Sequence, residues 1–164
     1  MDRDCDIVHM RRALALAERG ERQAGAAPIG CVIVLDGAII GEGYNQVFGR
    51  CDATAHAEVI AMRDAGSRLK RPLFRGATLY STLQPCGMCS MASIWCNISR
   101  IVFGAGRDQV HRMYFEDRHL DTMNFIRDAY RDDIGIEGGV LAADCARLYY
   151  GPDDNPPRAE QTNI

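Results

Sequence analysis

The sequence predicts an α/β domain in which helices cover a sheet that includes parallel strand pairs. Three observations support this fold class. Strand and helix patterns alternate from the middle of the chain onward, an antiparallel hairpin is indicated near its start, and 164 residues that are 47% apolar and 25% charged are sufficient for one hydrophobic core. These proportions exclude disordered and collagen-like chains. We expect one domain over residues 1–151 and a polar tail over residues 152–164.

The first part of the chain is expected to form a helix and a hairpin. Apolar residues recur at helical spacing from Ile7 to Ala17, which predicts an amphipathic helix over residues 5–23. Two apolar, β-branched runs, residues 29–35 and 38–44, follow as strands. Asp36-Gly37 lies between them and is the type of dipeptide that supplies the positive φ angles of a tight hairpin.

The second part alternates between helices and strands. Gly66 is expected to end one helix, and Pro85 is expected to begin another at Cys86, because proline presets the backbone φ angle and donates no hydrogen bond. In chain order the predicted elements are a helix over 55–65, a strand over 77–83, a short helix from 86, a strand over 98–104, a charged helix over 117–130, a strand over 136–140 and a last helix that ends at 150.

Charge and hydropathy restrict the partners that the chain is expected to have. The net charge is −3, the basic residues are scattered among 22 acidic ones, and the acidic segment 152–155 repels phosphates, so nucleic acid is not a favoured partner. The longest nearly apolar stretch, 26–35, is far shorter than the roughly 20 residues that cross a bilayer. The first residues lack the basic and apolar regions of a secretory signal, so we expect a cytoplasmic protein.

Two short motifs carry the chemistry. His56-Ala57-Glu58 opens one predicted helix, and Pro85-Cys86-Gly87-Met88-Cys89 opens another. One imidazole and two thiolates are the donor set of a catalytic Zn²⁺ site, which keeps its fourth tetrahedral position for water. The seven cysteines form no even disulfide framework, and Cys51 and Cys96, which lack paired spacing, are expected to lie in the core.

We therefore predict that His56, Cys86 and Cys89 bind Zn²⁺ and that Glu58 moves protons. The positive ends of the two helices favour the thiolate form of the cysteines. A zinc ion in such a site lowers the pKa of water from 15.7 to roughly 7. Glu58 is two positions from a ligand, close enough to act as general base and then as general acid.

These motifs resemble the signature of the cytidine deaminase-like superfamily of zinc aminohydrolases, His-x-Glu followed by Pro-Cys-x-x-Cys. The resemblance extends from the first predicted helix through the strand at 98–104. It implies a three-layer α/β/α sandwich on a mixed five-stranded sheet, with the ligands at the starts of two adjacent helices. It also implies a homodimer that packs through the motif helices.

The resemblance implies hydrolytic removal of an amine from a nucleobase or nucleoside, with guanine or a related purine as the favoured substrate. Phe115-Glu116-Asp117 is similar to the Phe-Asp-Asp of guanine-type members, which makes Asp117 the candidate reader of the purine edge. Asn45 matches an asparagine that hydrogen-bonds the base, and the backbone N–H groups of Ala57 and Cys86 are further candidates. A tRNA adenosine deaminase, a cytosine- or triazine-type deaminase and a non-catalytic zinc-binding module remain as alternatives.

Overall fold

A mixed five-stranded sheet lies at the centre of the molecule, in the strand order β2-β1-β3-β4-β5. The computed structural model describes residues 3–21, 27–115, 122–128 and 133–157. The β1 strand pairs antiparallel with both β2 and β3, whereas the β3–β4 and β4–β5 pairs are parallel. The strands are β1 (Gly30–Leu35), β2 (Ala38–Tyr44), β3 (Thr78–Leu83), β4 (Arg100–Ala105) and β5 (Gly135–Glu137).

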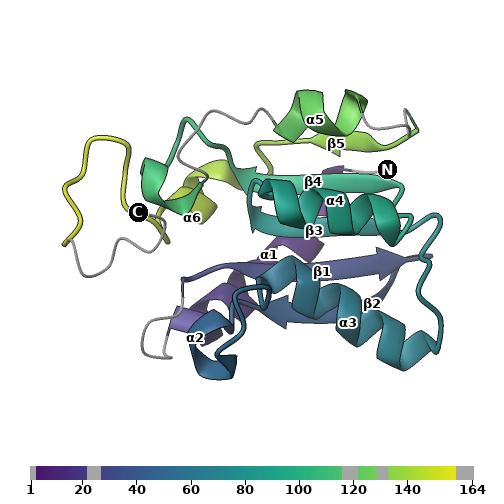
Figure 1. Ribbon diagram of the computed structural model, residues 1–164. Coiled ribbons are helices and arrows are strands. Elements are labelled where there is room, and N and C mark those ends of the chain that lie inside the picture. The colour runs from purple at the N-terminus through teal and green to yellow at the C-terminus, as the bar shows by residue number, and fades with distance from the viewer. Residues whose placement is uncertain (1–2, 22–26, 116–121, 129–132, 158–164) are drawn as a thin grey trace.

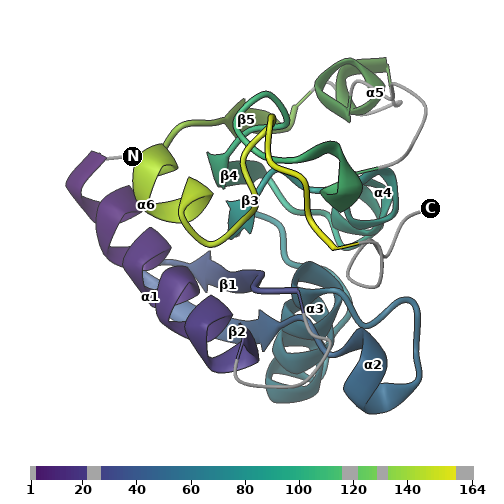
Figure 2. The same ribbon diagram turned by 90° about the vertical axis from the view of Figure 1, so that its left-hand side faces the viewer.

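Helices cover both faces of this sheet, which confirms the predicted α/β/α sandwich. The α3 and α4 helices lie on one face, and α1 and α6 lie on the other (Figures 1 and 2). Among the described residues, no helix combines the length and apolar character needed to cross a bilayer. The helices are α1 (Arg3–Glu21), α2 (Val47–Arg50), α3 (Ala57–Leu69), α4 (Gly87–Trp95), α5 (Thr122–Asp128) and α6 (Ala142–Ala146), with a 3₁₀ turn over Arg112–Tyr114.

The local predictions hold for the hairpin and fail at three element ends. The last helix, α6, ends at Ala146 rather than at residue 150, because the chain beyond it continues in turns in which the amides of Leu148 and Tyr149 bond to the carbonyls three residues before them. Asp36 and Gly37 have φ angles of 51° and 77°, as the tight turn requires. Gly66 does not end α3, so that prediction was wrong: one glycine costs a helix only about 1 kcal/mol, and the helix continues to a left-handed residue at Lys70. The β5 strand ends before Gly139, which has a φ of 89°.

A buried ion pair fixes α1 to the face of the sheet opposite α3. Asp6 is 1% exposed, and its carboxylate accepts two hydrogen bonds of 2.7 Å from Arg100 of β4 and one of 2.7 Å from the hydroxyl of Tyr80 on β3. Hydrogen bonding to Arg100 holds the pKa of Asp6 below its usual range. The carboxylate is therefore ionised, and α1 is tied to the two central parallel strands.

Two glycines of β2 let α3 lie unusually close to the sheet. A Cβ atom added at Gly43 would lie 2.3 Å from the carbonyl oxygen of Ala57 and 2.6 Å from the amide nitrogen of Ala61. At Gly41 it would lie 2.3 Å from the carbonyl oxygen of Ala61. These are backbone atoms of α3, so the helix would have to move as a body to make room. The position of its first turn therefore depends on the missing side chains.

We expect Gly43→Ala to destabilise the fold by about 2 kcal/mol, because overpacking a core costs roughly 1–3 kcal/mol. Thermal unfolding should shift down by roughly 6 °C, and zinc affinity should fall because His56 directly precedes the first residue of α3. Gly135→Ala in β5 is the matched control, since its Cβ would meet nothing closer than 3.6 Å. Equal melting temperatures for the two variants would contradict the close approach.

Candidate active site

The three predicted ligand residues meet where the first turns of α3 and α4 lie side by side. His56 precedes the first residue of α3, Cys86 precedes the first residue of α4, and Cys89 lies in the first turn of α4. The Nδ1 atom of His56 is 3.7 Å from Sγ of Cys86 and 3.6 Å from Sγ of Cys89. Tetrahedral zinc with bonds of about 2.3 Å to sulfur and about 2.05 Å to nitrogen requires a sulfur-to-nitrogen distance of about 3.6 Å. The ligand atoms therefore fit zinc, with His56 contributing Nδ1.

The electrostatics of the site favour anionic sulfur even before a metal binds. A hydrogen bond from the Cys89 thiol, together with His56, lowers the pKa of Cys86 to about 4. The same hydrogen bond and burial raise the pKa of Cys89. Binding a divalent cation favours the thiolate form of both cysteines and releases the protons that they carry.

Glu58 lies in the first turn of α3 and points inward. Its side chain is 3% exposed, its Oε1 accepts a hydrogen bond of 3.1 Å from the hydroxyl of Ser81, and its Oε2 lies 3.5 Å from Sγ of Cys89. Burial raises the pKa of this carboxyl, and the negative charge of Cys86 adds to the effect. A carboxylate beside a ligand, yet outside the ligand set, is placed to hold a proton near the metal position.

Ser81 is the site residue that the sequence reasoning missed. Alternate residues of β3 serve opposite faces of the sheet. Tyr80 bonds Asp6 of α1, and Thr82 bonds the hydroxyl of Tyr149 at 2.8 Å, whereas Ser81 bonds Glu58 of α3. A hydroxyl between Tyr80 and Thr82 in a strand that leads into Pro85-Cys86 could have been recognised as facing the ligand helices.

The three predicted substrate contacts differ in what the structure describes of them. Asn45 is 5% exposed, and its side-chain oxygen accepts a hydrogen bond of 3.3 Å from the amide of Val47, so that half of the carboxamide supports the turn into α2. Ala57 is fully buried as the first residue of α3, where a backbone N–H lacks a helical partner. Asp117 lies outside the described residues. The roles of Asn45, Ala57 and Asp117 in substrate binding stay predictions.

The remaining cysteines supply no fourth ligand. Within the described part of the chain, one group of three or more His, Cys, Asp or Glu residues has all its ligand atoms within 4.8 Å of one another, and it consists of His56, Cys86 and Cys89. Cys51 is exposed rather than buried, so its predicted core position was wrong: it has a φ of 51° and ends the short α2 helix. Cys96 is half-buried against the core. The candidate ligand group therefore has three side chains, the number that a catalytic zinc site uses.

The sequence also matches a known protein family. Residues 3–105 match the family described as the cytidine and deoxycytidylate deaminase zinc-binding region. The chain belongs to the cytidine deaminase-like superfamily. The matched residues include all three ligands and Glu58, so this deaminase domain uses zinc as its cofactor.

Three similar proteins cover most of the deaminase domain. A tRNA-specific adenosine deaminase of Buchnera aphidicola subsp. Schizaphis graminum is 36% identical over 143 residues, which is 87% of this chain and 90% of the relative. A structure from a study of A-to-I editing by tRNA:A34 deaminases at the wobble position of transfer RNA has a TM-score of 0.72 and 32% identity. The match covers 86% of this chain and 98% of that chain. The guanine deaminase of Bacillus subtilis has a TM-score of 0.60 and 37% identity, and the match covers 65% of this chain and 66% of that chain.

We expect Ser81→Ala to lower kcat roughly 3- to 20-fold with zinc content and KM unchanged, because the hydroxyl fixes one oxygen of Glu58. Ser81→Thr keeps a hydroxyl and should recover much of the loss. Steady-state kinetics and zinc analysis of the three proteins check this. Equal impairment of the alanine and threonine variants would point to packing and against the hydrogen bond.

Proposed function

We propose that this chain is a tRNA adenosine deaminase, which converts adenosine in RNA to inosine and releases ammonia. The observation that carries the chemistry is the convergence of one imidazole, two thiolates and a buried carboxylate at two helix starts. The substrate assignment rests on the 36%-identical relative of that name, whose length is matched over 90%.

This proposal replaces the guanine preference derived from the sequence. The guanine deaminase of Bacillus subtilis is matched over only 66% of its chain, whereas the structure from the tRNA-editing study is matched over 98%. The residue expected to read guanine, Asp117, lies outside the described part. The acidic net charge argued against RNA, but net charge does not report how charges are distributed over a surface.

The residues of the chain perform the proton transfers in this proposal. A zinc ion held by His56, Cys86 and Cys89 would supply a Lewis acid that makes water nucleophilic at neutral pH. Glu58 accepts a proton from that water as its oxygen adds to C6 of adenine, and then delivers it to ring N1. The proton of the new C6 hydroxyl then passes through Glu58 to the exocyclic nitrogen, the C6–N6 bond breaks, ammonia leaves, and the C6 carbonyl of inosine remains. Ser81 holds Oε1 of Glu58 during both transfers.

The substrate assignment is tested with a panel of substrates. The zinc-loaded chain should form inosine in a tRNA anticodon stem-loop that carries adenosine, measured by mass spectrometry of digested RNA, and should release little ammonia from free guanine, cytosine or adenine. Glu58→Gln should retain zinc and lose at least about 10²-fold in turnover. Ammonia release from guanine without any inosine in the stem-loop would reject the proposal in favour of the guanine alternative.

A homodimer that packs through α4 is part of the same proposal. Met88, Met91, Ala92 and Trp95 recur at helical spacing along one stripe of α4, and Trp95 is 67% exposed. An indole with that much exposure on an apolar stripe supports burial against another subunit. A second copy of α4 offers the same stripe, as a two-fold symmetric interface requires.

Trp95→Glu should therefore convert a dimer into the 18.1 kDa monomer, because the charge would be desolvated in the interface. Leu73→Glu is the matched control, since Leu73 is also exposed, at 50%, and lies outside the α4 stripe. Sedimentation analysis of both variants decides the point. A dimer that survives Trp95→Glu and dissociates with Leu73→Glu would place the interface elsewhere.

A further inference from the structure

A groove of about 540 Å³ runs along the β2 edge of the sheet, between the end of α1 and the outer side of α3. Four arginines and two carboxylates line it, together with the aromatic ring of Tyr44. The arginines come from three helices, namely Arg19 of α1, Arg50 of α2, and Arg63 and Arg68 of α3. A positive groove is unexpected in a chain with a net charge of −3.

The carboxylates of the groove already have basic partners. Arg12 approaches Glu42 at 2.6 Å, and its hydrogen bond lowers the pKa of that carboxyl, which stays ionised. Arg68 approaches Asp64 at 2.8 Å. Asp64 also accepts a hydrogen bond of 2.9 Å from the backbone amide of Glu42. Neither acid is therefore placed to neutralise a further arginine.

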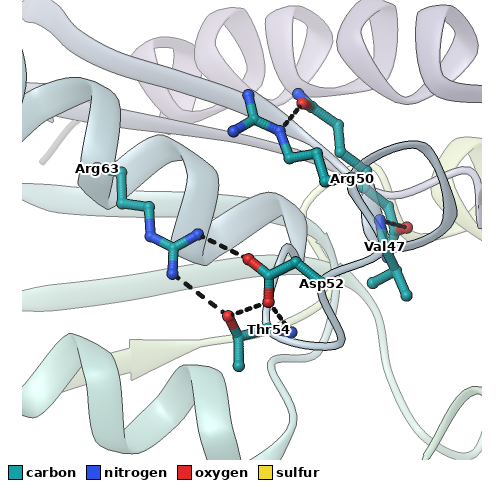
Figure 3. A network of polar contacts seen from close by, with 7 residues as sticks. Val47, Arg50, Asp52, Thr54 and Arg63 are labelled. Carbon is teal, nitrogen blue, oxygen red and sulfur yellow. Dashed lines mark hydrogen bonds and ion pairs between the residues drawn. The ribbon is translucent and has the colours of Figure 1, made fainter.

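Arg63 and Arg50 both line the groove and have separate polar partners (Figure 3). Arg63 donates to Asp52 at 3.2 Å and to the hydroxyl of Thr54 at 3.3 Å. Arg50 donates to the side-chain oxygen of Gln46, which is neutral. Arg63 lies seven residues beyond His56 on α3, a rise of about 10 Å along the helix axis.

Two of the arginines carry charge that no described carboxylate offsets. The contacts that the structure gives for Arg50 and Arg19 within the described residues are with neutral groups, the amide of Gln46 and the ring of Tyr44, whose centroid is 5.4 Å from the guanidinium carbon of Arg19. With Arg12 included, five arginines face the carboxylates of Glu42, Asp52 and Asp64, so two positive charges are left over.

An exposed aromatic side chain belongs to the same short helix as one of these arginines. Phe48 belongs to the same four-residue helix as Arg50 and is 54% exposed. Grooves that bind single-stranded nucleic acid combine arginines along the backbone with aromatic rings on which bases stack. We propose that the groove between α1, β2 and α3 binds the phosphate backbone of the RNA substrate, with Arg19 and Arg50 contacting phosphates and Phe48 contacting a base beside the active site. This inference rests on the proposed function and adds to it where the RNA lies.

Arg19→Gln and Arg50→Gln test the groove. Each should weaken binding of an anticodon stem-loop roughly 3- to 10-fold in 0.1 M KCl, and each should reduce the slope of log Kd against log salt by about 0.7 to 1. In turnover, KM should rise while kcat stays the same. Phe48→Ala should weaken binding without changing the slope, because it removes no charge.

Arg127→Gln is the matched control. Arg127 is exposed on α5, beyond the opposite edge of the sheet (Figure 1), and donates to the neutral side chain of Asn124 at 3.2 Å, so it loses the same charge outside the groove. Its Kd and salt slope should equal those of the unaltered chain. The proposal would be overturned if Arg19→Gln and Arg50→Gln had the same Kd and salt slope as the unaltered chain. It would also be overturned if the two substitutions weakened binding of adenosine monophosphate but not of the stem-loop.

The Kd measurements are repeated with a stem-loop that carries inosine in place of adenosine. This comparison separates the groove proposal from the proposed function. Arginine-dependent binding of both stem-loops together with inosine formation supports both proposals. Inosine formation together with binding that does not depend on the arginines would contradict the groove proposal and leave the proposed function standing. Arginine-dependent binding without inosine formation removes the adenosine deaminase assignment and leaves an RNA-binding groove. Melting temperatures within about 2 °C of the unaltered chain establish that the variants are folded.

Discussion

The contact between α3 and β2 is the constraint on which the zinc site depends. Gly41 and Gly43 allow backbone atoms of α3 to approach the strand more closely than any side chain would permit. This approach sets the height of the first turn of α3 above the sheet, and hence the position of His56 relative to the cysteines of α4. A shift of even 1 Å would leave the nitrogen-to-sulfur distances outside the range for one tetrahedral ion.

The strand β3 links the two faces of the domain to this site. Its residues alternate, so that Tyr80 reaches the buried carboxylate of Asp6 while Ser81 reaches that of Glu58. The first pairing fixes α1 on one face, and the second orients the Glu58 carboxyl group on the other. Because both pairings are buried, each side chain is held by packing as well as by its hydrogen bond, which is how an active-site group is kept in a single orientation.

The sequence predicted the parts of this arrangement that depend on local pattern. Two short motifs predicted His56, Cys86 and Cys89 as a candidate ligand group, which the structure brings together, and Asp36-Gly37 predicted the hairpin, because each signal is a short local pattern. The effect of Gly66 was predicted wrongly because α3 is stabilised by packing against the sheet, which a local rule does not contain. Ser81 was missed because its importance comes from Glu58, which is 23 residues away in the chain.

The net charge of the chain has the same limitation as a guide to nucleic-acid binding. A net charge of −3 is a sum over the whole chain, whereas a phosphate interacts with charges within about one Debye length, roughly 8–10 Å at physiological salt. The arginines beside β2 are distant in sequence, Arg19 and Arg50 among them, and folding gathers them around one groove. An acidic protein can therefore present a local positive surface to an RNA strand.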